Sequence, residues 1–216
     1  MSRVVVAEGV GTALLLAAVV GSGIMAERLS GGNDALALLA NSFATAAALI
    51  ALISAFAPVS GAHFNPVVTI ASIVERGTAT RELLPRLAAQ FTGAIAGVIA
   101  AHWMFGLQTL TLSTRERGGA AQMWSEVVAT FGLVGVIHAT GKRPHVVPMV
   151  VAAYIAAAYW FTASTSFANP AVTLARAFTN TFTGIRLADV GPFIAAQLAG
   201  GIGATFLFRW LYAEVP

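Results

Sequence analysis

The stretch Ser60-Gly61-Ala62-His63-Phe64-Asn65-Pro66-Val67-Val68-Thr69 has a close counterpart in Ser166-Phe167-Ala168-Asn169-Pro170-Ala171-Val172-Thr173. In both, asparagine directly precedes proline and a short apolar run. Proline fits the first turn of a helix, because its missing N–H would be unpaired there anyway. Asparagine is a strong N-cap and has an amide NH2 that can donate hydrogen bonds. Each stretch therefore predicts a helix that begins with an asparagine donor at its positive end.

The composition indicates an integral membrane protein. Of 216 residues, 57% are hydrophobic and only 10% are charged. Soluble domains carry about 25% charged residues, so this chain lacks the polar surface that would cover a globule. A net charge of +3 does not favour nucleic acid as a partner. Cysteine is absent, which excludes disulfides, thiolate metal sites and cysteine nucleophiles.

Six stretches approach the roughly 20 apolar residues that a spanning helix needs. They lie at about 4–25, 35–57, 83–106, 123–140, 146–163 and 190–212. The apolar runs after the two Asn-Pro pairs, about 66–74 and 170–178, are too short to cross. They predict re-entrant half-helices, which are tolerated where irregular backbone lines a water-filled cavity. Because Glu8 interrupts the first apolar run and no clear cleavage site follows, we expect a retained span rather than a signal peptide.

The chain also repeats itself within a single domain, residues 1–216. Three landmarks recur in the same order, at offsets of 118, 104 and 107 residues: Glu8 with Glu126, Asn65 with Asn169, and Gln90 with Gln197. The two repeats, about 1–106 and 120–216, each hold three spans. An odd number of spans turns the second repeat upside down in the membrane. Inverted repeats place their site near the midplane, where discontinuous helices meet.

The orientation of the chain follows from its basic residues. With the N-terminus inside, seven Lys and Arg residues lie on the cytoplasmic side and five lie outside. Positive charge favours the cytoplasmic side, so the sequence predicts cytoplasmic termini. Small residues recur in the spans, and Gly93 with Gly97 forms a G-x-x-x-G pattern that allows close helix packing in lipid.

Together these features resemble the aquaporin family, the major intrinsic proteins. The paired Asn-Pro motifs, one within Ser-Gly-Ala-His-x-Asn-Pro, and the repeated Glu and Gln landmarks carry the resemblance, which covers nearly the whole chain. It implies an aquaporin-like inverted repeat of six transmembrane helices and two half-helices. It also implies a homotetramer in the lipid bilayer, here a bacterial inner membrane, with one pore per subunit for small uncharged solutes. We expect no cofactor, no metal and no enzymatic activity.

Asn65 and Asn169 are the predicted pore donors, and the alternative is that they serve only as helix caps. The two roles are compatible, because a cap orients the amide. Two positive helix ends facing one another would repel cations and break a proton-conducting chain of water.

Glu8 and Glu126 are acids within spans, where an unpartnered charge is costly. One interpretation makes them coupling residues of an ion-driven transporter. In the other, which the resemblance favours, they accept hydrogen bonds from backbone N–H groups of the re-entrant loops. We expect His63, Pro66 and Pro170 to support the same loops.

In the family, a narrow ring outside the asparagine pair sets selectivity. The family pattern maps it onto Thr45, Ala157, Ser166 and Val172. The family's usual residue at the last position is arginine. The four residues present are small, so the resemblance implies a ring that is wider, less polar and uncharged. Arg176, four residues after Val172, is an alternative source of charge, although one helical turn displaces it toward the far end of the half-helix.

A wide ring without arginine resembles bacterial aquaglyceroporins associated with arsenic resistance. It implies passage of glycerol and of neutral metalloid hydroxides such as arsenite and antimonite. A water-selective channel is the nearest alternative. A secondary transporter built from inverted repeats is a further one, which would show a dependence on ion gradients.

Overall fold

The structure is a computed structural model that describes residues 2–213, so the last three residues of the second predicted repeat lie outside the described part. The described residues form eight α-helices and one short 3-10 helix, with no strand among them. In chain order these elements are α1 (Ser2–Leu29), α2 (Asp34–Ser60), α3 (Pro66–Val74), η1 (Thr80–Glu82), α4 (Leu83–Met104), α5 (Ala120–Thr140), α6 (Val147–Phe161), α7 (Pro170–Arg176) and α8 (Leu187–Leu211).

The helices match the predicted spans and half-helices with small differences at their ends. Five helices of the described chain are long and apolar enough to cross a membrane, and α6 is a shorter apolar helix of 15 residues. The predicted span 146–163 is longer than α6 because Thr162 adopts an extended backbone (φ −111°, ψ 139°) that ends the helix. Helix α3 has the predicted bounds. Helix α7 ends at Arg176, two residues early, where Ala177 and Phe178 close tighter turns onto Leu174 and Ala175.

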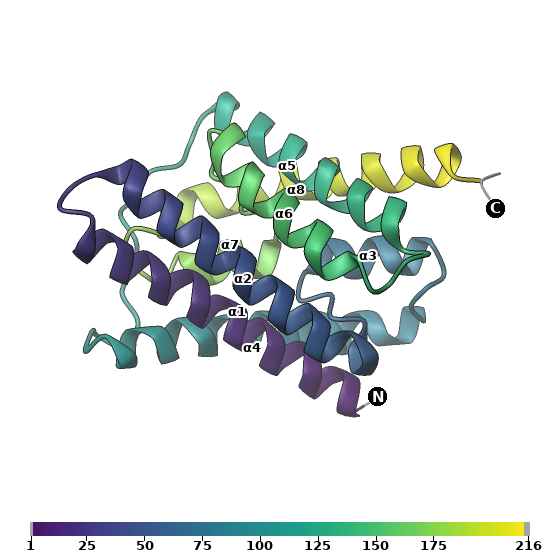
Figure 1. Cartoon of the computed structure of the whole chain (residues 1–216), viewed down its shortest axis with the longest axis horizontal. Helices are drawn as coiled ribbons and strands as arrows, with labels where there is room; N and C mark the ends of the chain where they lie inside the picture. Colours follow the sequence, from purple (N-terminus) through teal and green to yellow (C-terminus); the bar gives the residue numbers. More distant parts are fainter. Residues whose placement is uncertain (1, 214–216) are drawn as a thin grey trace.

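The two halves of the chain pack in the same way. Helix α1 lies against α4 and α2, and α5 lies correspondingly against α8 and α6. Each half-helix bridges the halves, since α3 contacts both α4 and α8 and α7 does the same. Figure 1 shows the two termini at one end of the molecule. The architecture is the inverted repeat that the sequence predicts.

Glycine permits the closest approach of helices at corresponding points of the two halves. A Cβ atom on Gly93 would lie 2.2 Å from the carbonyl oxygen of Gly9, where α4 crosses α1. On Gly200 it would lie 2.3 Å from the carbonyl oxygen of Val127, where α8 crosses α5. Backbones in such contact gain the van der Waals packing that holds helices together in lipid.

We expect Gly93→Ala to destabilise the protein by about 1–3 kcal/mol, because the added methyl group forces α1 and α4 apart. Gly203→Ala in α8 is the matched control, since a Cβ atom there would lie at an ordinary van der Waals distance, 3.8 Å, from the nearest atom, on the Phe131 ring. It should leave stability unchanged or raise it slightly, because alanine is the better helix former. Thermal unfolding in detergent measures both variants. Equal melting temperatures for the two would contradict this account of the α1–α4 contact.

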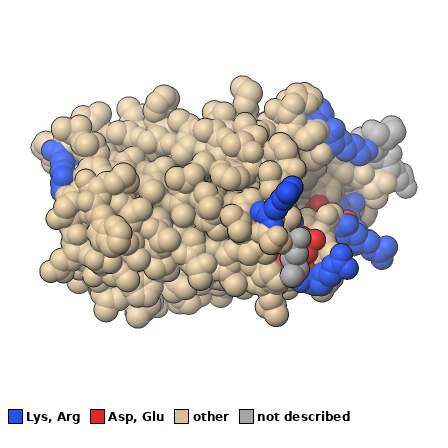
Figure 2. Space-filling model, turned by 90° about the horizontal axis from the view of Figure 1, so that it is seen from below, with Lys and Arg blue, Asp and Glu red and all other residues tan. Residues whose placement is uncertain are grey.

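The outer surface is suited to lipid. In Figure 2, Lys and Arg appear at the two ends of the molecule and the face between them is uncharged. Large apolar side chains, among them Phe43, Trp103 and Phe206, are exposed on the outside of the bundle. Exposed apolar patches of this extent are rare on soluble monomers. The chain is an integral membrane protein.

Candidate functional site

Each Asn-Pro pair begins a half-helix. Asn65 has an extended backbone, and its Oδ1 accepts the N–H of Val67 at 2.9 Å. Asn169 does the same for Ala171 and Val172, at 3.0 and 3.3 Å. Proline then occupies the first helical position in both. The caps use the side-chain oxygens, so the amide nitrogens point away from the helices that they begin.

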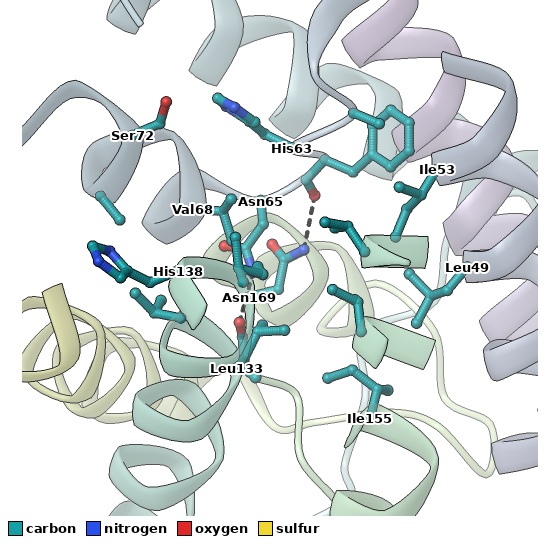
Figure 3. Close-up of a pocket in the computed structure, with 18 of the residues that line it drawn as sticks. Leu49, Ile53, His63, Asn65, Val68, Ser72, Leu133, His138, Ile155 and Asn169 are labelled. Carbon is teal, nitrogen blue, oxygen red and sulfur yellow. Dashed lines mark hydrogen bonds between the residues drawn. The ribbon is translucent and has the colours of Figure 1, made fainter. Parts of the chain in front are cut away.

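Those amide nitrogens tie the two half-helices together. Nδ2 of Asn65 donates to the carbonyl oxygen of Ala168 at 2.7 Å, and Nδ2 of Asn169 donates to that of Phe64 at 2.8 Å (Figure 3). Each asparagine therefore bonds to the residue that precedes the other. An amide nitrogen carries two hydrogens, so each asparagine retains one N–H.

Two fully buried carboxylates hold the loops that lead into the half-helices. Glu8 accepts the N–H groups of His63 and Phe64 at 3.0 and 2.8 Å. Glu126 accepts those of Phe167 and Ala168 at 2.9 and 2.8 Å. Carboxylates suit this task because they accept several hydrogen bonds at once. Both acids thus make the loop-supporting contacts that the resemblance favoured.

A glutamine completes each carboxylate cluster. Gln90 donates to Glu8 at 2.8 Å, and Gln197 donates to Glu126 at 2.6 Å. Each glutamine also donates to a threonine on its half-helix. One of these threonines, Thr69, bonds Nδ1 of His63 at 3.1 Å, which places the histidine beside the first half-helix.

The supported loops have an unusual backbone. Ala62 and Phe64 have φ of 50° and 49°, and Ser166 and Ala168 repeat the pattern at 52° and 49°. Non-glycine residues in this left-handed region cost about 1–3 kcal/mol each and persist only where their surroundings hold them. The carboxylate bonds to the loop N–H groups provide that restraint. In this conformation, the carbonyl groups of Phe64 and Ala168 point toward Asn169 and Asn65, which donate to them.

A cavity of about 740 Å³ runs past the asparagine pair. Both asparagines and His63 line it, together with other residues of the two loops. The opposite wall is hydrocarbon, contributed by α1, α2, α5 and α6: Leu15, Leu49, Ile53, Leu133, Val151 and Ile155. Figure 3 shows Leu49, Ile53 and Ile155 on this apolar side. A small solute in the cavity meets hydrogen-bonding groups on one side and hydrocarbon on the other.

The structure brings together three of the four predicted ring residues. Thr45, Ser166 and Val172 are buried and line the cavity. Ala157 is exposed on α6 and is not among the lining residues, so its assignment was wrong. Two residues later, Tyr159 lines the cavity, and its hydroxyl lies 3.2 Å from the hydroxyl of Thr45. A shift of two residues turns a side chain by about 200° around a helix.

The ring also contains residues that the family pattern did not assign to it. Tyr159 supplies an aromatic side chain where we expected none, and Arg176 lines the same cavity. The sequence offered a signal for Tyr159, an amphipathic side chain that follows a run of alanines. Arg176 is the alternative source of charge that the sequence offers, one helical turn after Val172.

Comparison with known proteins identifies the family. Residues 1–159 match the model of the family described as major intrinsic protein. The chain is 54% identical to the aquaglyceroporin AqpS of Rhizobium meliloti, over 98% of this chain and 91% of that protein. It is 28% identical to the probable aquaporin TIP2-2 of Oryza sativa, over 96% of this chain and 86% of that one.

Among solved structures, the aquaglyceroporin from Plasmodium falciparum superposes with a TM-score of 0.71 at 19% identity, covering 99% of this chain and 96% of the other. This likeness shows a shared fold. The family model and the Rhizobium relative show descent, and members of the family are passive channels rather than enzymes. The chain belongs to the major intrinsic protein family.

Proposed function

We propose that this protein is a passive channel that admits glycerol and neutral metalloid hydroxides such as arsenite and antimonite, and also water. The observation that carries the proposal is the two-sided cavity, polar along the loops and apolar along the helices, that runs past the asparagine pair. Molecules with hydroxyl groups on a compact apolar frame suit such a lining. The similarity to a relative named an aquaglyceroporin supports the same solute class.

In this proposal, the remaining N–H of Asn65 and that of Asn169 donate to the passing solute. Thr45, Tyr159, Ser166 and Val172 form the ring that a solute passes outside the asparagine pair. Glu8, Glu126, His63, Pro66 and Pro170 keep the loops in position. The opposed positive ends of the half-helices disfavour cations, so uncharged solutes are the natural cargo.

We also propose a homotetramer in a bacterial inner membrane with cytoplasmic termini. The termini share one end of the molecule, as an even number of crossings requires. The charge distribution of the loops favours that end for the cytoplasm. The tetramer follows the usual assembly of the family.

Stopped-flow light scattering on proteoliposomes tests the solutes. After a hyperosmotic glycerol or arsenite pulse, vesicles with the protein should shrink and then reswell much faster than empty vesicles. Reswelling should proceed down the solute gradient without any ion gradient. Fast water movement without glycerol or arsenite entry would favour a water-selective channel. Uptake that requires an ion gradient would favour a secondary transporter.

A further inference from the structure

We propose that Arg176 and Ser166 form an outer subsite that binds oxygen atoms of uncharged, hydroxyl-bearing solutes, and that Arg176 determines which solutes enter. The inference rests on the proposed function, because it concerns the same passage. It assigns to Arg176 a direct contact with the solute, although the residue lies outside the four-residue ring pattern. Its support comes from the position of the side chain, from its partners and from the unsatisfied hydroxyl group of Ser166.

Arg176 faces the passage although it is buried. It is the last residue of α7, four positions after Val172. Residues four apart share one face of a helix, and both of these line the cavity. Only 2% of Arg176 is exposed, so its charge sits inside the protein rather than in solution. A solute that approaches Val172 from the end of α7 therefore moves along a wall to which Arg176 belongs.

The protein holds the guanidinium group by one edge and one face. Nε of Arg176 donates to the carbonyl oxygen of Thr183. The guanidinium carbon lies 3.4 Å from the centre of the Phe167 ring, a cation–π contact that Arg117 also makes at 5.0 Å. Within residues 2–213, the two terminal nitrogens of Arg176 have no hydrogen-bond acceptor and no carboxylate in ion-pair contact. These donors remain for a solute.

Ser166 supplies a second unsatisfied group at the same cavity. Ser166 is 4% exposed, and its Oγ has no hydrogen-bond partner in the described chain. A buried hydroxyl without a partner is costly, whereas nearly all other polar groups of the two loops are bonded. Its Oγ is covered in this conformation, so a molecule in the passage completes its bonding when the Ser166 side chain turns about χ1 toward the cavity that the residue lines. The hydroxyl can donate or accept, and the guanidinium group only donates.

An internal carboxylate offsets part of the cost that burial and the neighbouring Arg117 impose on the charge of Arg176. In the first half of the chain, Glu8 has a direct cationic partner, Arg86, at 3.4 Å. Within the described residues, Glu126 of the second half has no such contact, and its negative charge acts on Arg176 and Arg117 across the loop. The second half therefore places one of its two cations, Arg176, on the wall of the passage, whereas Arg117 does not line it.

These features define the chemistry of the subsite. A fixed guanidinium group with free N–H donors repels cations and attracts acceptor oxygens. The hydroxyl group of Ser166, the residue before the Phe167 ring on which Arg176 stacks, accepts a hydrogen bond from a solute O–H. The pair therefore suits an uncharged molecule with at least two hydroxyl groups, which can accept from Arg176 and donate to Ser166.

Permeability ratios measured on the same vesicles test the subsite. We expect Arg176→Gln to lower the ratio of glycerol to water permeability about fivefold, the effect of losing roughly one hydrogen bond. It should also raise the leak of potassium ions. Arg176→Lys should keep potassium out and recover only part of the ratio, because it retains the charge without the planar donor array. Ser166→Ala should lower the ratio without any potassium leak.

Arg28→Gln is the matched control. Arg28 also stacks on a phenylalanine, Phe105, at 5.1 Å, but it is exposed and does not line the cavity. It lies at the same end of the molecule, since its neighbour Glu27 bonds the N–H of Phe182, beside Thr183. This variant should match the wild type in both ratio and leak. Monodisperse size-exclusion profiles in detergent establish that each variant is folded.

The outcomes separate the subsite from the proposed function. One outcome is that the wild type passes glycerol and that both Arg176→Gln and Ser166→Ala keep its ratio of glycerol to water permeability without a potassium leak. This outcome refutes the subsite and leaves the proposed function standing. If the wild type passes water alone, the solute proposal fails, and the subsite for hydroxyl-bearing solutes fails with it. If Arg176→Gln does not fold, an unchanged ratio in both Arg176→Lys and Ser166→Ala refutes the subsite.

Discussion

Replacing Asn169 with aspartate is expected to reduce the flux of uncharged solutes at least about tenfold, because a bond of about 1–3 kcal/mol becomes a repulsion. The substitution preserves size and the capping oxygen. In the wild type, Nδ2 of Asn169 donates to the carbonyl oxygen of Phe64 at 2.8 Å. In the variant, a carboxylate oxygen takes the place of Nδ2 and faces that carbonyl oxygen. The substitution also adds negative charge where two helix ends supply positive potential, so cations should enter. Stopped-flow glycerol flux and a potassium-leak assay measure both effects.

Asn180→Asp is the control for that substitution. Asn180 is exposed in the loop after α7, and its Oδ1 accepts from the N–H and the hydroxyl of Thr114, bonds that aspartate retains. It should behave as wild type. If Asn169→Asp conducted glycerol as well as Asn180→Asp, the hydrogen bond from Asn169 to the Phe64 carbonyl would not be needed for solute flux.

The second large effect concerns stability. We expect Glu126→Leu to destabilise the fold by about 3–6 kcal/mol, because three buried donors lose their acceptor. These donors are the N–H groups of Phe167 and Ala168 and the amide of Gln197. The left-handed residues Ser166 and Ala168 would also lose their restraint, so flux should fall together with the melting temperature.

Glu116→Leu makes the same chemical change at a solvent-exposed ion pair with Arg186. Exposed pairs contribute about 0–1 kcal/mol, so this variant should melt near the wild type. Thermal unfolding in detergent and glycerol flux in vesicles measure the pair of variants. A Glu126→Leu protein as stable as Glu116→Leu would show that the carboxylate does not hold the loop.

Local signals predicted much of the architecture. An Asn-Pro pair before a short apolar run contains all of the capping chemistry, so both half-helices could be located from the sequence. Buried acids such as Glu8 and Glu126 need partners in lipid, and the nearest unsatisfied donors were the re-entrant loops. The left-handed residues had no such signal, because Phe64 and Ala168 are not glycines.

The errors arose where the answer depended on the geometry of connections. A fixed offset from Asn169 selected Ala157, but the orientation of α6 depends on the length of the connection, residues 162–168, that joins it to the half-helix. That connection brings Tyr159 to the cavity instead. For Arg176, the spacing of one helical turn from Val172 predicts a displacement toward the far end of α7. The turn after α7 brings the Thr183 carbonyl back to it and holds the guanidinium group at the passage.

The most direct test of the passage uses the absence of native cysteine. A single cysteine at Val172, which lines the cavity, should let a small methanethiosulfonate stop glycerol flux by forming a mixed disulfide, and a reductant that cleaves this disulfide should restore the flux. A single cysteine at Ala163, exposed in the connection after α6 and absent from the cavity lining, should react without any effect on flux. Full glycerol flux through labelled Val172→Cys, or block through labelled Ala163→Cys, would contradict the claim that solutes travel along this cavity past the asparagine pair.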